Sequence, residues 1–288
     1  MRRVIAAVDN TAAAMPVLST AAAAARLFHA KLQAIHVEEA TTPTAARAAA
    51  SAIGTRLLLV KGPTVAAAVT RIALQEDVMA IVLGVRSTPS GRRPAGHVAI
   101  KVATAVPKPV IVVPPDCVMP VHFRRVLIPL DRDMVTASAL RETIEALQGA
   151  RAEIVLLHIF EERDLPLVTD QPQHETDAWI SEFLRRYCPY VDVRRVELRA
   201  GMPAEHLLTV AGEIGADALV LAWGQRLLPG RAVLVRTALE HSRVPVILVP
   251  VQRRSAGSPA DDRIGQSYSL LGPRGRDRNP HRSRALPR

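Results

Sequence analysis

Short apolar runs that end on a polar residue recur along the chain and predict the strands of an α/β protein. One run covers residues 4–8 and stops at Asp9, and a second covers residues 126–130 and stops at Asp131. Runs of this length without alternation indicate strands that are buried on both faces. Apolar residues between the runs recur at helical spacing, for example at Val65, Ala68, Val69 and Ile72.

The two halves of the chain repeat one pattern. Residues 34–38 and 156–160 form a second pair of apolar runs, at the same offset as the first pair. Strands that alternate with helices predict right-handed crossovers and a parallel sheet with helices on both faces. The remaining paired segments are the turns Gly62-Pro63 and Gly201-Met202-Pro203, the runs 80–84 and 218–222, and the proline-bracketed runs 110–113 and 246–249.

We therefore predict an α/β protein with two tandem, doubly wound, open parallel sheets of the Rossmann-like type. The predicted boundaries are a first domain at residues 1–116, a linker at 117–123, a second domain at 124–251 and a tail at 252–288. The second domain carries an insertion at residues 161–176 that we interpret as a loop. Ligands in such sheets lie beyond the carboxyl ends of the strands, where Asp9, Val37 and Gly84 should converge.

Charge and composition narrow the classes of function. The net charge of +10 is concentrated in the tail, which holds nine Arg and three Asp and few apolar residues. Such a segment cannot bury enough surface to fold, so we expect a disordered, solvated tail, with a phosphate-binding arm as the alternative. Two cysteines form neither a disulfide framework nor a zinc site, and no apolar run reaches 18 residues. We expect a cytoplasmic location and no membrane partner.

Several of these segments together resemble the universal stress protein family. They are the strand ending in Val8-Asp9, the strand Ile35-His36-Val37, the Gly62-Pro63 turn, and a glycine-containing loop before a final Val-Pro-Val strand. The resemblance covers about residues 3–114 and again 124–250. It implies an adenine-nucleotide α-hydrolase-like unit of five strands that pairs with another unit through its last strand. The two copies would then form an internal pseudo-dimer, and further homo-oligomers and protein partners stay open.

The resemblance also implies where a nucleotide would bind. In nucleotide-binding members, the residues at the positions of Asp9 and Val37 contact adenine, and a glycine-rich loop with a Ser or Thr holds the phosphates through backbone N–H groups. The first copy departs from this loop, with Ser87 at a glycine position, one residue fewer before Gly96, and His97 in place of the hydroxyl residue. The candidate cofactor-binding residues are Asp9, Val37, Gly84, Ser87, Gly96, His97 and Val98.

The second copy departs further, because Leu227, Ala232 and Val233 occupy the loop positions after Gly224. Any surviving ATP site is therefore expected in the first copy. His36 and His158 have a simpler interpretation as hydrogen-bonded structural histidines. Asp9 and Asp131 have two open interpretations, as caps of the helices that follow them or as ligand contacts. An apolar helical face is expected to be core at Trp179, Ile180, Phe183, Leu184 and Tyr187.

No catalytic motif and no metal-ligand spacing is present in the sequence, so we expect a protein that is not an enzyme. Three hypotheses remain. The first is a non-catalytic stress-response protein that acts through association, with its ATP sites partly or wholly lost. The second is an adenine-nucleotide sensor or slow ATPase that uses the first copy. The third and weakest is nucleic-acid binding through the basic tail.

Overall fold

The structure is a computed structural model of the whole chain, and it describes residues 1–38, 42–85, 97–160, 172–189, 195–226 and 232–251. Residues Met1–Gln252 form one structural unit. The predicted tail, most of the predicted insertion, and the loop residues Ser87, Gly96 and Leu227 lie outside the described residues.

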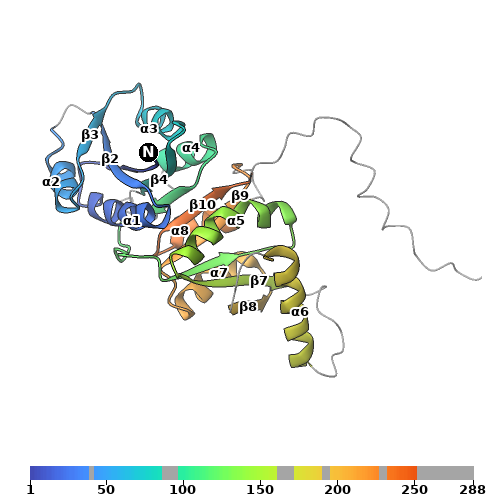
Figure 1. Cartoon of the computed structure of the whole chain (residues 1–288). Helices are drawn as coiled ribbons and strands as arrows, with labels where there is room; N and C mark the ends of the chain where they lie inside the picture. The colour runs from blue at the N-terminus through green and yellow to red at the C-terminus, as the bar shows by residue number, and fades with distance from the viewer. Residues whose placement is uncertain (39–41, 86–96, 161–171, 190–194, 227–231, 252–288) are drawn as a thin grey trace, which may run out of the picture. The chain divides into compact units, whose positions relative to one another are not determined.

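Strands and helices alternate through the first half, as the apolar runs predict (Figure 1). The elements are β1 (Arg3–Ala7), α1 (Ala14–Leu27), β2 (Lys31–Val37), α2 (Thr44–Ala52), β3 (Leu57–Val60), α3 (Val65–Ala73), β4 (Val78–Gly84), α4 (His97–Ala105) and β5 (Val110–Val113). The strands β1, β4 and β5 are buried over most of their length because helices cover both of their faces, whereas the edge strand β3 is mostly accessible.

The second half follows the same order of elements. The predicted insertion loop is wrong at its end, because α6 begins at Pro172 and residues 172–176 are helical; proline is accepted there because the first turn of a helix needs no N–H from it. The elements are β6 (Arg125–Pro129), α5 (Met134–Gly149), β7 (Glu153–Phe160), α6 (Pro172–Tyr187), β8 (Arg195–Ala200), α7 (Pro203–Glu213), β9 (Ala218–Trp223), α8 (Val233–His241) and β10 (Val246–Pro250).

The ten strands form one sheet in the order β3-β2-β1-β4-β5-β10-β9-β6-β7-β8. All neighbouring strands are parallel except β5 and β10, which pair antiparallel through Val110–Val112 and Val246–Leu248. The predicted α/β class with parallel strands is confirmed. Antiparallel pairing of β5 with β10, the last strands of the two halves, joins the two predicted sheets into one and satisfies backbone groups that would otherwise form two open edges.

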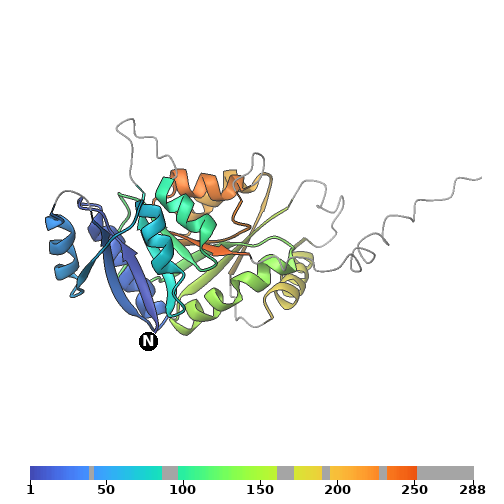
Figure 2. The same cartoon turned by 90° about the horizontal axis from the view of Figure 1, so that it is seen from above.

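Two hydrophobic clusters lie on opposite faces of this sheet. One contains buried residues of α1, α2, α5 and α6, and the other contains buried residues of α3, α4, α7 and α8. Figure 2 shows the two helical layers with the sheet between them. The apolar face of α6 belongs to the first cluster, where Phe183 is 4.9 Å from Trp179 and 5.1 Å from Tyr187 between ring centroids. The prediction that this face is core is confirmed for Trp179, Phe183, Leu184 and Tyr187, whereas Ile180 is partly exposed and belongs to neither cluster.

The two glycine turns have different physical reasons. A Cβ atom on Gly62 would lie 2.7 Å from the Cβ of Ala68, so glycine is required there by close packing against α3. Gly201 has φ of 122°, which side-chain-bearing residues rarely adopt. Pro203 then stands in the first turn of α7, whereas α3 starts after Thr64, whose hydroxyl accepts a hydrogen bond from the Ala67 N–H at 3.1 Å.

A polar contact also joins the halves beside β5 and β10. The Gln225 side chain, which follows β9, donates hydrogen bonds to the carbonyls of Ala103 at 2.9 Å and Val106 at 2.8 Å. These carbonyls lie at the C-terminal end of α4, where backbone acceptors lack helical partners. Gln225 has φ of 55°, a conformation that costs a non-glycine residue energy and is held by these two contacts.

Candidate functional site

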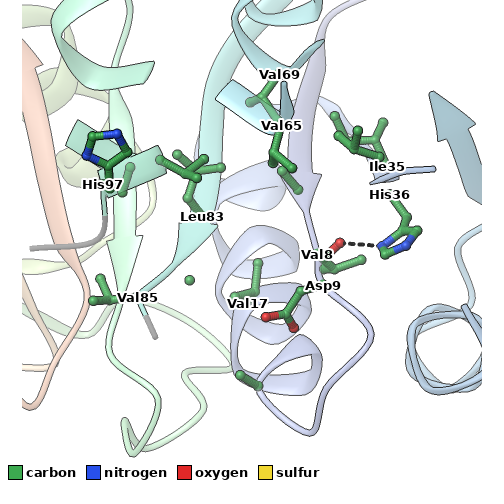
Figure 3. Close-up of a pocket in the computed structure, with 16 residues that line it drawn as sticks. Val8, Asp9, Val17, Ile35, His36, Val65, Val69, Leu83, Val85 and His97 are labelled. Atoms are coloured by element: carbon green, nitrogen blue, oxygen red, sulfur yellow. Dashed lines mark hydrogen bonds between the residues drawn. The ribbon is translucent and has the colours of Figure 1, made fainter. Parts of the chain in front are cut away.

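A cavity of 330 Å³ opens at the carboxyl ends of β1, β2 and β4 in the first half (Figure 3). The chain proceeds from β1 to β2 on one side and returns to β4 on the other, so the cavity lies where the strand order reverses. Its walls are mainly aliphatic, and its polar side chains come from Asp9, His36 and His97. Aliphatic walls are contributed by Val17, Ile35, Val65, Val69, Leu83 and Val85.

The structure brings most of the predicted site residues together. Asp9, Val37, Gly84, His97 and Val98 all line this cavity. They come from the loop after β1, from β2, from β4 and from α4, and their convergence follows from the parallel arrangement of β1, β2 and β4. Ser87 and Gly96 lie outside the described residues, so their predicted place beside the phosphates stays a prediction.

Asp9 directs its carboxylate toward the cavity, near Val17 (Figure 3). Its Oδ1 accepts a hydrogen bond of 2.6 Å from the Thr11 hydroxyl, whose oxygen accepts another from the Ala13 N–H at 3.2 Å. The alternative that Asp9 caps α1 is wrong: α1 begins at Ala14, and its N-cap residue, Ala13, makes no side-chain capping bond. The cap position of α1 falls on Ala13, so Asp9 is not the residue that caps this helix.

The capping alternative is wrong for Asp131 as well. Its Oδ1 accepts a hydrogen bond from the Asp133 N–H at 3.2 Å, which closes a short turn. Asp133 is the residue that caps α5, because its carboxylate accepts from the Val135 N–H at 2.8 Å. Asp131 was a candidate cap because it follows the apolar run directly, but the chain turns into the helix only at Asp133, two residues later.

Both strand histidines are structural, as predicted. The Nδ1 of His36 lies 2.9 Å from the carbonyl oxygen of Val8, and the Nδ1 of His158 lies 2.8 Å from that of Leu130. Both rings are buried. Each bond ties the end of one strand to its neighbour, so in the first half His36 fixes the backbone that places Asp9.

Gly84 and His97 shape the opposite wall of the cavity. A Cβ atom on Gly84 would lie 3.1 Å from Cγ2 of Val17, so any side chain would reduce the space between β4 and α1. His97 is exposed and is the first residue of α4, whose N-terminal turn, including Val98 and Ala99, lines the cavity. Backbone N–H groups in a first helical turn attract anions.

The corresponding place in the second half has a different chemistry. Asp131 and Gly224 occupy positions equivalent to Asp9 and Gly84, but the helices beside them begin with the exposed aliphatic residues Met134 and Val233. Val233 is the first residue of α8, as His97 is of α4, and it has no side-chain donor for a phosphate. The helices α1 and α5 both begin with a residue that has none, Ala14 and Met134.

Two contributions to the site were missed by the sequence analysis. Thr11, which holds the Asp9 carboxylate, carries no motif that marks it. Val65 and Val69 were assigned only to an apolar helical face, and both also line the cavity. Helical spacing identifies which residues face the sheet, but it does not distinguish residues that meet side chains from those that meet empty space.

The strand order and the cavity at its reversal define a doubly wound α/β protein with a ligand-sized pocket. The profile of the Universal stress protein family matches residues 122–250, a little under half of the chain. These residues therefore form a universal stress protein domain. No curated protein matches the sequence.

Solved structures are similar to this chain over both of its halves together. A universal stress protein from Archaeoglobus fulgidus DSM 4304 is 16% identical with a TM-score of 0.59, over 86% of this chain and 96% of that one. A candidate universal stress protein from Pseudomonas aeruginosa UCBPP-PA14 is 13% identical with a TM-score of 0.64, over 87% and 93%. At these identities the similarity shows a common fold.

Within the described residues, no group of three His, Cys, Asp or Glu side chains is placed to hold a metal ion. No described helix is long and apolar enough to cross a membrane.

Proposed function

We propose that this protein is a stress-response protein of the universal stress protein type that binds an adenine nucleotide in its first half without catalysing a reaction. One observation carries the proposal: Asp9, Val37, Gly84, His97 and Val98, predicted as ligand contacts, line a single cavity. Its volume of 330 Å³ lies within the range of small-molecule sites. The second half would serve mainly as its structural partner.

The chemistry of the cavity suits an aromatic base with polar edges. Aliphatic side chains from α1, α3 and β4 offer apolar surface to the faces of such a base. The Asp9 carboxylate can accept a hydrogen bond from an exocyclic amino group, and the Val37 backbone stands at the end of β2. The N-terminal turn of α4, with His97 beside it, is placed to receive the phosphates.

The absence of catalysis belongs to the proposal. The titratable side chains that line the cavity are Asp9, His36 and His97, and the Nδ1 of His36 is already used on the Val8 carbonyl. Asp9 and His97 stand at opposite walls in Figure 3. No described pair in the cavity therefore combines a nucleophile with a general base in hydrogen-bonding contact.

We also propose that the halves are two copies of one unit, with domains at 1–116 and 124–251 joined by a linker at 117–123. The common order of their strands about β5 and β10 supports this view. The arrangement would be an internal pseudo-dimer. A cytoplasmic location and further self-association stay predictions.

A second candidate function is association alone, with both nucleotide sites lost. It is favoured by the aliphatic residues Met134 and Val233 in the second half and by the altered loop of the first.

The two candidate functions are distinguished by whether denatured protein releases a bound nucleotide. The purified protein is denatured, and the supernatant is analysed by mass spectrometry for adenine nucleotides. Nucleotide that is present in wild type and absent from Asp9→Ala supports the proposal, whereas empty protein with no thermal shift at millimolar ATP supports association alone.

A further inference from the structure

We propose that the open edge of β3 binds an extended, acidic segment of a partner protein as an additional strand of the sheet. The ten-stranded sheet has two edges, β3 at one end and β8 at the other. Figure 1 shows β3 beside α2 at the outer limit of the first half. Unpaired backbone groups on an edge strand are a template for another strand.

The direction of the β3 backbone follows from one hydrogen bond. The Glu38 N–H donates to the Val60 carbonyl at 2.9 Å, so the backbone groups of Val60 face β2. Because these groups alternate along a strand, those of Leu59 and Leu57 face away from the sheet. The next outward carbonyl, on Lys61, is already occupied by the Arg71 guanidinium at 2.7 Å. The open edge is therefore the stretch from Leu57 to Leu59.

The β8 edge is protected where the β3 edge is not. The Gly201 N–H donates to the Phe160 carbonyl, so Leu198 is a residue whose backbone faces outward. The carbonyl of Leu198 accepts a hydrogen bond of 3.1 Å from the guanidinium of Arg199. Arg199 also pairs with Glu197 and Glu213, each at 2.9 Å. Charged side chains over an edge discourage pairing with another chain, whereas β3 has the sequence Leu-Leu-Leu-Val.

A hollow of 450 Å³ lies along β3 and supplies the recognition chemistry. Its lining combines Leu57 and Leu59 with Arg47 of α2 and Arg56 at the start of the strand. Leu59 is 39% exposed. Both arginines are exposed, and among the described residues neither forms an ion pair. The hollow thus suits an extended segment with small apolar side chains and flanking carboxylates.

The same charges argue against two other occupants. In a two-fold pairing of β3 with a second copy, strands run antiparallel, which brings the Arg56 end of one strand to the Lys61 end of the other. Lys61 lies 3.5 Å from the Glu38 carboxylate, but its side chain is 84% exposed, so this pair is screened by solvent and compensates the charge only in part. Like charges across neighbouring strands are destabilising. The tail at 252–288 carries nine Arg and three Asp, so it is repelled by Arg47 and Arg56. An acidic segment of a different protein is the occupant that matches the charge.

The probe is a blocked, fluorescein-labelled peptide, Glu-Asp-Val-Thr-Val-Thr-Val-Asp-Glu, titrated with the full-length protein and followed by fluorescence anisotropy. We expect saturable binding. The dissociation constant should rise at least about ten-fold when the acidic ends are replaced by Lys or when alternate core residues are N-methylated, because each change removes several hydrogen bonds or charge contacts, and each of these contributes a several-fold factor to affinity. An N-methylated peptide that binds as well as the original would overturn strand addition.

Leu59→Pro tests the edge itself. Proline removes an outward N–H and leaves the bonds to β2 in place, a substitution that edge strands tolerate. The matched control is Leu198→Pro, which removes an outward N–H at β8. We expect Leu59→Pro to abolish peptide binding, Arg47→Glu with Arg56→Glu to weaken it at least about ten-fold, and Leu198→Pro to leave it unchanged.

Three results would contradict the proposal: no saturable rise in the anisotropy of the labelled peptide as the protein is added, equal loss of binding in both proline variants, or a peptide-free dimer that disappears in Leu59→Pro. The last would assign the edge to a second copy. Circular dichroism checks that the variants fold. If Leu59→Pro does not, the comparison between acidic and N-methylated peptides on wild-type protein still decides the matter.

Discussion

Substituting Gly84 with alanine should weaken nucleotide binding while leaving the fold intact. The added Cβ would lie 3.1 Å from Cγ2 of Val17, closer than ordinary van der Waals contact, so Val17 or the ligand has to move by a few tenths of an ångström. The φ of Gly84 is not in the left-handed region, so alanine is compatible with the backbone. Overpacking of this kind costs about 1–3 kcal/mol, which corresponds to a dissociation constant raised about five- to 150-fold.

Gly224→Ala is the matched control, because Gly224 follows β9 as Gly84 ends β4, and its Cβ would meet nothing within 4 Å. Both variants lose backbone freedom in the unfolded state, which stabilises by about 0.4–1 kcal/mol where the conformation fits. Calorimetric titration with ATP and thermal melts separate binding from stability. Equal affinities for ATP in wild type and Gly84→Ala, or equal loss in Gly224→Ala, would refute the placement of the ligand.

Three further substitutions or treatments test individual contacts. His36→Leu leaves the Val8 carbonyl without its ring partner and should lower the free energy of unfolding in urea by about 1–3 kcal/mol; an unchanged midpoint would show that the bond is dispensable. Hydrogen bonds from Arg3 lower the pKa of Asp77, so this carboxylate stabilises the fold above its ordinary pKa and loses that effect as pH falls through its lower folded pKa. Asp77→Asn should therefore reduce the melting temperature at pH 7, and the difference from wild type should disappear in strong acid; a constant difference at all pH values would contradict this assignment. Burial raises the pKa of the Cys188 thiol to about 11, so iodoacetamide at pH 8 should label this thiol quickly only in urea. Labelling is followed by mass spectrometry, and rapid labelling of the native protein would contradict the burial of Cys188.

The sequence predicted the buried strands well and the edge strands poorly. Continuous apolar runs identify β1, β4, β5 and their counterparts, because helices cover both faces and every residue is selected to be apolar. β8 reads Arg-Val-Glu-Leu-Arg-Ala, a pattern that a polar loop could also show, and β3 has only four residues. Neither strand was predicted from the sequence. An edge strand forms through pairing with its neighbour in the sheet, and the local sequence pattern carries no information about that neighbour.

The site was predictable where it depends on strand ends and unpredictable where it depends on loops. Asp9, Val37 and Gly84 each end or follow a strand, so the parallel topology alone brings them together. The predicted capping roles were wrong because the number of residues between strand and helix decides which side chain reaches the first turn. Asp133 caps α5, and no side chain caps α1. Thr11 acts through a local turn that no periodicity reveals.

The most direct test of the account is the number of nucleotide sites per chain. Titration of purified, nucleotide-free protein with ATP should give one site, which is lost in Asp9→Ala and kept in Asp131→Ala, because only the first half is proposed to hold the nucleotide. The two substitutions remove the same carboxylate after the first strand of each half. A difference in ATP binding between the two variants therefore shows which half holds the nucleotide. Two sites, or one site that survives in Asp9→Ala and disappears in Asp131→Ala, would contradict the proposed division of roles.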